Sequence, residues 1–370
     1  MREPYKVIVW GPGRMGGISI WEIVNSPAFE LVGVRVYSDR KNGVDAGELV
    51  GIEATGVIAT NNVDELLTVA CDCIIYTAHD EGTYHTDDEI LKILAAGKNI
   101  VTPLPYQNAQ MFREAAFVDK LEAACRAGHS AFYADGIDPH LIPNRILLGL
   151  TNGSADVKSV KLQEHWDCSE AEQGPLQYIG FGMAPEEAEH IQVSRTMAAN
   201  FMNGIVHTAE KVLGVKYDRI VASHDYIPAP ADIAKPFPIK AGTVARITHR
   251  MQGFVDNIGN NPLFTIEYHW HIGESMLPAG IAKGEYYVGT IEGRPSMRMT
   301  LNYSVSNYSR ERFFMLGNME VEPSYVATIM PCIQAIPLVC AAAPGVMPSL
   351  DPAINWKQDF RDIAAAASWQ

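Results

Sequence analysis

Two patterns of hydrophobic and polar residues follow one another along the chain. Up to about residue 150, short apolar runs alternate with segments of helical periodicity. Strands that alternate with helices in this way predict an α/β fold with a doubly wound parallel sheet. The expected strands are Val7–Trp10, Leu31–Tyr37, Val57–Ala59, Cys73–Thr77 and Ile100–Thr102, and the clearest helices are Asp87–Ala96 and Gln110–Ala127.

Beyond about residue 155, longer runs alternate with a period of two. In Phe264–His271 the apolar residues fall on one face, and Glu267, His269 and His271 fall on the other. The pattern predicts an α+β domain with a mostly antiparallel sheet, covered on one side by helices such as Ser194–Leu213. The other strands expected there are Val157–Trp166, Val244–Val255, Tyr286–Ile291 and Met297–Tyr303.

The first apolar run leads directly into the motif Gly11-x-Gly13-x-x-Gly16. Strand, glycine turn and helix in this order are typical of a dinucleotide-binding Rossmann domain. Gly11 permits the sharp turn, Gly13 lets the backbone approach a pyrophosphate, and Gly16 lets the helix and strand pack closely. Together with Arg14 and Met15, these glycines are expected to hold a nicotinamide dinucleotide.

Further cofactor contacts are expected at other strand ends, since ligands of such sheets lie at the carboxyl ends of the strands. The positions concerned are Thr77, Ala78, His79 and Pro103.

The loop after the second strand bears on the choice between NAD and NADP. Ser38, Arg40 and Lys41 suit the 2′-phosphate of NADP, so NADP(H) is favoured and NAD(H) is possible. Asp39 could instead serve as the carboxylate of an NAD site, and the segment could also be a solvated charged turn.

The length of 370 residues suits two domains with cores of their own. We expect a dinucleotide-binding domain at 1–150 and a substrate and dimerisation domain at 151–325. A C-terminal helical segment at 326–370 is expected to pack back near the cofactor domain. Three prolines interrupt the apolar run Tyr325–Val346, which therefore predicts a buried, kinked helix rather than a membrane span.

Composition narrows the range of partners and locations. The formal net charge of −14 argues against nucleic acid and against an anionic membrane surface, both of which attract basic patches. The first strand begins too close to residue 1 for a signal peptide, and six scattered cysteines fit reduced thiols. These features predict a cytoplasmic protein.

Motifs in a fixed order extend along nearly the whole chain. They are Gly11–Gly16, Asp45–Leu49, Gly136–Pro139, Gln163–Glu164, Gly180–Gly182, Ala209–Gly214 and Ala335–Cys340, followed by Pro344–Gly345. In this order the chain resembles the 2,4-diaminopentanoate dehydrogenase and native amine dehydrogenase family, whose N-terminal domain is similar to that of dihydrodipicolinate reductases. The resemblance implies hydride transfer from NAD(P)H to an imine made from a ketone and ammonia, or the reverse oxidation of an amine. It also implies a homodimer.

The chain departs from the family pattern at two places. The family has an active-site glutamate just after the fifth strand, whereas this chain reads Pro103-Leu104-Pro105-Tyr106 without a carboxylate. The family's Gly-x-Pro-Gly segment also ends here in His140 instead of glycine. The fold and the cofactor therefore follow more firmly from the resemblance than the amine chemistry does.

Three residues are candidates for catalysis. Tyr106 could donate a proton to a carbonyl oxygen, or it could line the pocket wall. His140 could supply the missing acid or cap the helix that begins near Leu141. Glu164 is the carboxylate best placed to substitute for the absent glutamate.

Two other groups have competing interpretations. His79 and Asp80 could form an acid/base pair or be polar loop residues. Glu267, His269 and His271 share a strand face in a pattern that resembles a metal site. Since hydride transfer from a nicotinamide needs no metal, we expect none, and we interpret these three as a polar sheet face at a subunit contact.

Three functions follow from these observations. The first is an NAD(P)H-dependent oxidoreductase, amine dehydrogenase-like, that acts on the C=N or C=O carbon of a small, fairly apolar substrate bound between the domains. The second is a carbonyl or activated-alkene reductase that works without ammonia. The third is a non-catalytic sensor that binds NADP(H).

Overall fold

The chain folds into two units, each described here by itself. The computed structural model describes residues 3–348 except 81–82, 172, 257–259, 278–280, 282–283, 285 and 309–310. Unit 1 comprises residues 3–80, 84–141 and 304–348, and unit 2 comprises residue 83 and the described part of 142–303. Residues 349–370 of the predicted C-terminal segment lie outside the described residues.

Unit 1 is built on a parallel sheet. Six of its described strands pair in the order β14-β5-β4-β3-β1-β2, and every pairing is parallel. The strands are β1 (Tyr5–Trp10), β2 (Phe29–Arg35), β3 (Cys73–Tyr76), β4 (Asn99–Thr102), β5 (Ala131–Ala134) and β14 (Gly345–Val346). This is the α/β Rossmann architecture predicted from the alternating pattern.

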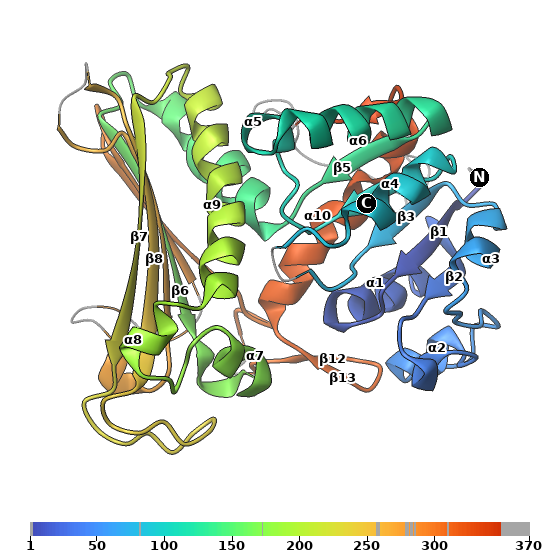
Figure 1. Cartoon of the computed structure of the whole chain (residues 1–370), viewed down its shortest axis with the longest axis horizontal. Coiled ribbons are helices and arrows are strands. Elements are labelled where there is room, and N and C mark those ends of the chain that lie inside the picture. Colours follow the sequence, from blue (N-terminus) through green and yellow to red (C-terminus); the bar gives the residue numbers. More distant parts are fainter. Residues whose placement is uncertain are drawn as a thin grey trace. The chain divides into compact units, whose positions relative to one another are not determined.

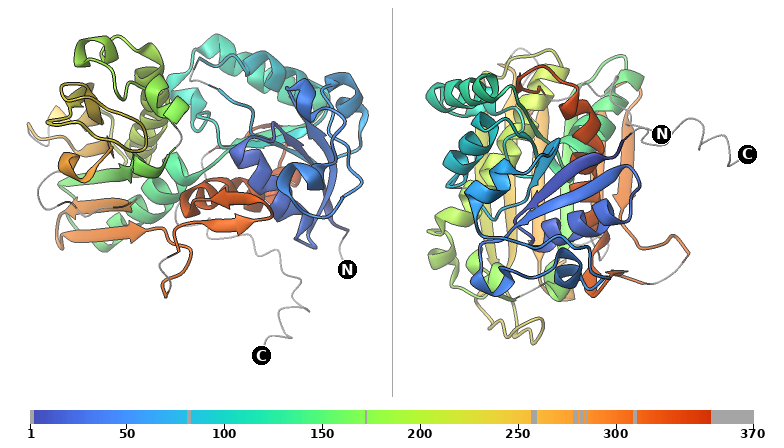
Figure 2. Two further views of the ribbon diagram at one scale, coloured as in Figure 1. Left: turned by 90° about the horizontal axis from the view of Figure 1, so that it is seen from below. Right: turned by 90° about the vertical axis from the view of Figure 1, so that its right-hand side faces the viewer.

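Helices cover both faces of this sheet, because each strand is apolar on both sides. On one face, Val9 and Val101 pack with Ile18 of α1 and Ile336 of α10, and Figures 1 and 2 show these two helices side by side. On the other face, Tyr76 packs with residues of α4 and α6. The helices of unit 1 are α1 (Arg14–Val24), α2 (Ala46–Val50), α3 (Val63–Thr68), α4 (Asp87–Ala95), α5 (Ala109–Phe112), α6 (Ala115–Gly128) and α10 (Pro323–Cys340).

The chain returns to unit 1 after residue 303. It forms the hairpin of β12 (Phe314–Leu316) and β13 (Met319–Val321) before α10. By length and apolar composition alone, α10 is the one described helix that could span a bilayer, but Ile329, Cys332 and Ile336 bury it in the core of unit 1. The prediction of a helix up to Val346 is wrong beyond Cys340, because Gly345–Val346 is extended and pairs with β5.

Unit 2 contains the predicted mostly antiparallel sheet. Its described strands pair in the order β11-β10-β6-β9-β8-β7, and only the β6–β9 pairing is parallel. The strands are β6 (Ser159–Asp167), β7 (Arg219–Pro228), β8 (Val244–Phe254), β9 (Phe264–His271), β10 (Tyr286–Glu292) and β11 (Met297–Asn302). The helices are α7 (Gln173–Tyr178), α8 (Pro185–Ala188) and α9 (Gln192–Val212), and α9 packs on β8 and β9.

The strands predicted from the sequence differ from the described strands at several places. Val57–Ala59 forms no strand, since Ile58 makes only an isolated bridge with Asp45. Five described strands were not predicted. Four of them, β5, β12, β13 and β14, are only two to four residues long, and β7 lies at an exposed edge where no buried face imposes an alternation.

Candidate functional site

The three glycines of the opening motif occupy three different environments. Gly11 follows β1 with φ +88°, a conformation that other residues rarely adopt, and its N–H donates to the carbonyl oxygen of Arg35. A side chain at Gly16 would overlap the carbonyl oxygen of Gly11, so this position has to stay without one. A side chain at Gly13 would meet nothing within 4 Å, so open space lies beside the backbone at this turn.

The open space at Gly13 lies at the N-terminus of α1. No side chain caps this helix end, and its first turn carries no acidic residue. Unpaired backbone N–H groups and the positive end of the helix dipole attract an anion there. The exposed Arg14 and the half-buried Met15 form the first turn beside it. A dinucleotide pyrophosphate fits this turn on both space and charge.

Thr77 fixes the glycine turn from the neighbouring strand. Its Oγ1 donates to the carbonyl oxygens of Trp10 at 3.1 Å and Gly11 at 2.9 Å. Ala78 is buried, and its backbone limits the space at Gly11. His79 is exposed and Pro103 is half-buried, both beyond the carboxyl ends of their strands. The expected cofactor loops therefore end at one edge of the parallel sheet.

The loop after β2 brings a lysine to the same turn. Asp39–Lys41 forms a short 3₁₀ helix, and Lys41 Nζ donates to the carbonyl oxygen of Pro12 at 2.7 Å. Ser38 and Arg40 are exposed. The carboxylate of Asp39, the alternative NAD-type ligand, accepts a hydrogen bond from Asn61 Nδ2 at 3.2 Å. This arrangement favours a cationic site over an acidic one.

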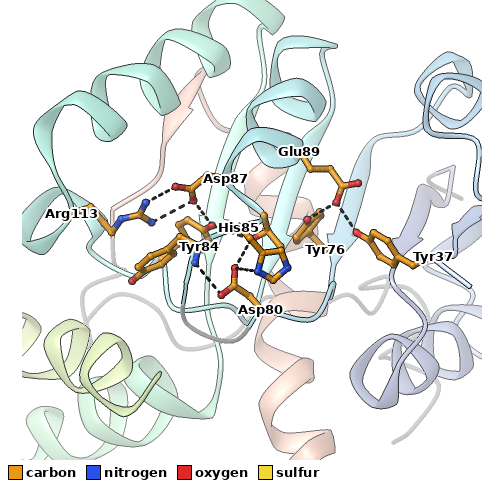
Figure 3. A network of polar contacts seen from close by, with 10 residues as sticks. Tyr37, Tyr76, Asp80, Tyr84, His85, Asp87, Glu89 and Arg113 are labelled. Atoms are coloured by element: carbon orange, nitrogen blue, oxygen red, sulfur yellow. Dashed lines mark hydrogen bonds and ion pairs between the residues drawn. The ribbon is translucent and has the colours of Figure 1, made fainter. Parts of the chain in front are cut away.

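Tyr106 is held in a buried polar network. Its side chain is only 1% exposed, its hydroxyl donates to Asp87 Oδ1 at 2.6 Å, and Thr86 Oγ1 lies 3.2 Å away. Arg113 Nη2 donates to the other oxygen of Asp87 at 2.6 Å (Figure 3). Burial and the bond to Asp87 raise the pKa of Tyr106 well above its ordinary value. The geometry favours the second of the two interpretations, a residue of the pocket wall.

Asp80 belongs to the same network. Its carboxylate accepts from Thr86 Oγ1 at 2.8 Å and from the backbone N–H of Tyr84 at 3.2 Å, and His85 Nδ1 lies 3.8 Å away (Figure 3). These contacts tie the loop after β3 to the start of α4. The suggestion that Asp80 acts in an acid/base pair with the exposed His79 stays a prediction.

His140 lies beside a buried aspartate that directly follows β5. Its Nδ1 is 3.4 Å from Asp135 Oδ1, and both side chains are almost fully buried. Asp135 also accepts a hydrogen bond from Tyr133 at 2.9 Å. Neither ring nitrogen of His140 has a hydrogen-bond partner among the described residues, so the ring does not cap the helical segment Ile137–Leu148 through a hydrogen bond. A histidine beside a carboxylate is suited to proton transfer.

Glu164 lies on β6 with a donor on each of its oxygens. Trp270 Nε1 donates to Oε1 at 2.7 Å, and the Tyr287 hydroxyl donates to Oε2 at 3.0 Å. The donors come from the two strands that flank β6, and the register puts Glu164 directly opposite Tyr287. The ring of Tyr268 stacks on that of Trp270, so aromatic side chains surround a fixed carboxylate.

The polar face of β9 carries an ion-pair cluster centred on Glu267. Glu267 is bound by Arg250 Nε at 2.6 Å, Lys161 Nζ at 2.8 Å and His269 Nε2 at 3.0 Å. Burial alone would raise the pKa of Glu267, but these three partners hold it well below its ordinary value. Across the described residues, no three potential ligands converge in a way that would hold a metal.

Several residues of these sites were missed from the sequence. Asp135 follows the short apolar run of β5, so recognising that strand would have pointed to it as a strand-end residue. Trp270 and Tyr287 contact Glu164 across 106 and 123 residues of chain, and no local pattern predicts such pairs.

Several known proteins are similar to this chain in sequence. Residues 5–102 match the family model for the N-terminus of dihydrodipicolinate reductase. An amine dehydrogenase from Streptomyces virginiae is 26% identical over 93% of this chain and 95% of its own length. A 2,4-diaminopentanoate dehydrogenase from Acetoanaerobium sticklandii is 22% identical over 98% of this chain and 97% of its own length.

Solved structures agree in fold. The structure of an amine dehydrogenase from Mycobacterium smegmatis superposes with a TM-score of 0.73 at 18% identity, with 97% of each chain covered. The enzyme GenD2 of gentamicin A biosynthesis, solved in complex with NAD, gives a TM-score of 0.51 at 15% identity over 91% of this chain and 87% of its own.

The chain is therefore an NAD(P)-dependent oxidoreductase. Along nearly its whole length it is similar to an amine dehydrogenase and a 2,4-diaminopentanoate dehydrogenase, and residues 5–102 match the N-terminal domain of dihydrodipicolinate reductase.

Proposed function

We propose that this oxidoreductase uses NADP(H) to move hydride to or from the C=N carbon of a small, fairly apolar substrate, as an amine dehydrogenase does. The names of both curated relatives support amine chemistry. The single observation that carries the proposal is Glu164, a carboxylate fixed by Trp270 and Tyr287 among aromatic rings. Carboxylates and aromatic faces both attract an ammonium group.

NADP(H) is the proposed cofactor. Lys41, hydrogen-bonded to the glycine turn, and the exposed Ser38 and Arg40 support it, because a 2′-phosphate needs cations and hydroxyl donors. Gly11, Gly13 and Gly16, with Arg14 and Met15, would hold the pyrophosphate at α1. Thr77, Ala78, His79 and Pro103 would line the cofactor at the other strand ends.

The residues of the chain have separate proposed tasks. When bound, the cofactor supplies or accepts the hydride at its nicotinamide ring. Glu164 holds the ammonium form of the nitrogen and takes up its proton as the amine becomes neutral. His140, oriented by Asp135, donates a proton to an oxygen that leaves as water or hydroxyl, or removes one in the reverse direction. Tyr106 lines the wall.

Carbonyl reduction without ammonia is the second candidate. It is favoured by the segment Pro103–Pro105, which has no carboxylate where the family places its glutamate. In that case His140 protonates the oxygen of the carbonyl, and Glu164 has no part in the chemistry.

We further propose a cytoplasmic homodimer with a small-molecule substrate and no nucleic acid or membrane partner. The six free thiols and the net charge of −14 support the location and the exclusion of polyanions. The family resemblance supports the dimer.

The test is NADPH oxidation against a panel of ketones and aldehydes, with and without a high concentration of ammonium. The proposal predicts rates that depend on ammonium. Rates that are independent of ammonium would move the chain to the second candidate. No turnover in either arm, with NADPH bound, would contradict both and favour a sensor.

A further inference from the structure

Strand β7 is an unprotected edge of the sheet in unit 2. It is the last strand in the sheet order, and among the described strands it pairs only with β8 (Figure 1). The strand is ten residues long, so its outer side presents a row of backbone N–H and C=O groups. Lysine, an internal proline or a bulge commonly protects such an edge from pairing with another chain. The segment Arg219–Tyr226 has no lysine or proline, and the one register shift of the strand comes later, between Ile227 and Pro228.

Two apolar side chains are exposed on this strand. Ile220 is 37% exposed and Val221 is 42% exposed. Because neighbouring residues of a strand point to opposite faces, one of them lies on each face of the sheet. A further strand paired with β7 would cover part of both side chains, and it would add this hydrophobic gain to that of the backbone hydrogen bonds.

Two opposite charges lie on one face of the same strand. Arg219 and Asp225 are both exposed, and they are six residues apart, so alternation places them on the same face. The guanidinium carbon of Arg219 lies 4.0 Å from the ring centre of Phe254. Neither Arg219 nor Asp225 forms an ion pair with another residue in the part of the chain that the structure describes. A partner with the complementary pair of charges would compensate both.

A second copy of this chain offers that complementary pair in one register. When β7 pairs with itself in antiparallel fashion, the two copies are related by a two-fold axis perpendicular to the sheet, and this axis keeps each residue on its own face. Residues that lie opposite each other must therefore both be odd or both be even in number. Among these registers, only the one centred on Ala222 places Arg219 of each copy opposite Asp225 of the other. The same register places Ile220 opposite His224.

We propose that β7 is an interface with a second copy of this chain, paired antiparallel about Ala222 so that the two sheets become continuous. The two ion pairs between Arg219 and Asp225 select the register, and the backbone hydrogen bonds supply most of the attraction. This inference rests on the homodimer proposed above and deepens it by naming the contact surface. Pairing of two strand edges buries less area than a standard interface, so we expect a dimer that dissociates in the micromolar range.

Charge reversal tests this interface, with the dimer constant measured by sedimentation at several protein concentrations. Asp225→Arg places two arginines opposite each other at both ends of the pairing and should weaken the dimer about tenfold or more at low salt. The double variant Arg219→Asp, Asp225→Arg recreates both opposite-charge pairs and should dimerise within about threefold of wild type. Glu292→Arg, an exposed position at the end of β10, makes the same change in net charge as Asp225→Arg and is the matched control.

An unchanged dimer constant in Asp225→Arg, or a double variant as weak as the single one, would overturn the interface. Recovery in the double variant also shows that the single variant is folded.

A cysteine at the symmetry axis tests the register independently. The exposed Ala222 lies opposite its own copy in the proposed pairing, so Ala222→Cys should form a disulfide between two chains when treated with oxidised glutathione. Thr300→Cys, also exposed but on the opposite edge strand β11, is the control and should remain monomeric on non-reducing gels. Equal yields of covalent dimer from both variants, or none from Ala222→Cys, would contradict the register.

The same measurements separate this inference from the proposed function. A dimer that ignores the charge reversals contradicts only the β7 surface and leaves another contact, such as the polar face of β9. A chain that is monomeric at every concentration contradicts both this surface and the proposed homodimer. Ammonium-dependent oxidation of NADPH tests the proposed chemistry in either case, because β7 carries none of the residues assigned to catalysis or cofactor binding.

Discussion

A single carboxylate separates the amine hypothesis from the carbonyl hypothesis. Glu164 is fixed from both sides by Trp270 and Tyr287, so its position does not depend on a flexible loop. In this it differs from the family's glutamate, which follows a strand end where this chain has Pro103 and Leu104. The acidic function has, on our proposal, moved from the cofactor domain to the sheet of unit 2.

Glu164→Gln is expected to lower the ammonium-dependent rate by about 10²–10⁴-fold, the usual effect of losing a general acid or base. Because the glutamine oxygen can still accept from Trp270 Nε1 while its NH2 group donates to the Tyr287 hydroxyl oxygen, folding and NADPH affinity should be preserved. Glu292→Gln, an exposed carboxylate at the end of β10, is the matched control. A rate equal to that of wild type in the Glu164 variant would remove this residue from the chemistry.

His165 follows Glu164 on β6, so its side chain lies on the opposite face of the same sheet. It is 2% exposed and stacks between His269 and Tyr286 at ring separations of 4.9 and 4.8 Å. Burial, together with His269 and His271, lowers the pKa of His165 to about 4. The unfolded chain, with an ordinary histidine pKa of 6.5, therefore binds a proton between pH 6.5 and 4 that the folded chain does not.

Stability should consequently fall as the pH drops through this window, by about 1.4 kcal/mol for each pKa unit that separates the two states. His165→Phe keeps the stacked ring but cannot titrate, so its loss of stability between pH 7 and pH 5 should be smaller. Urea unfolding of both proteins at the two pH values measures the difference. Parallel losses in the two proteins would show that other groups dominate acid unfolding.

At the scale of elements, two glycines of the turn between β1 and α1 have different expected roles: Gly13 in cofactor binding and Gly16 in stability. A methyl group at Gly13 enters open space, whereas one at Gly16 overlaps the Gly11 carbonyl oxygen and lies 2.7 Å from Thr77 Oγ1. The free energy of unfolding of Gly13→Ala should therefore lie within about 0.5 kcal/mol of the wild-type value. The variant should bind NADPH weakly, because its methyl group occupies the space expected for the pyrophosphate.

Gly16→Ala should instead lose roughly 1–3 kcal/mol of stability, since the β1–α1 turn has to shift to admit the methyl group. Urea melts and NADPH titration of the two variants give the comparison. Equal stability of the two alanine variants would contradict the assigned packing of Gly16, and full NADPH affinity in Gly13→Ala would contradict the pyrophosphate position.

Elements with strong local periodicity could be predicted from the sequence. The strand at Phe264–His271 has the bounds that alternation predicts, and the turn at Gly11–Gly16 lies between β1 and α1 as its motif requires. The edge strand β7 could not be predicted in this way, because most of its residues are exposed and no buried face imposes a period.

The candidate site likewise has features that could be predicted from the sequence and features that could not. The glycine turn depends on neighbouring residues, so its motif is visible in the sequence. The partners of Glu164 depend on strand register between distant segments, and a single sequence does not contain that register. Tyr106 was a candidate for catalysis because it lies just after a strand, and the hydrogen bond from its hydroxyl to Asp87 could not be predicted from that position; its catalytic role stays a prediction.

The whole molecule has to bind an anion although its net charge is −14. A negative field repels an anionic cofactor, so binding depends on local cations and on the α1 N-terminus. Arg35, Arg40 and Lys41 are grouped within seven residues of chain at the end of β2, next to the glycine turn. The proposed cofactor thus explains why cations gather at this one edge of an acidic protein.

Hydride transfer to a substrate carbon is the central claim, and NADPH that carries deuterium at both C4 positions tests it most directly, because either face of the nicotinamide then delivers the label. The labelled cofactor is incubated with the ketone panel and ammonium, and the products are identified by mass spectrometry. The account predicts an amine that carries one deuterium on the former carbonyl carbon. Tight binding of NADPH without any deuterated product would contradict it.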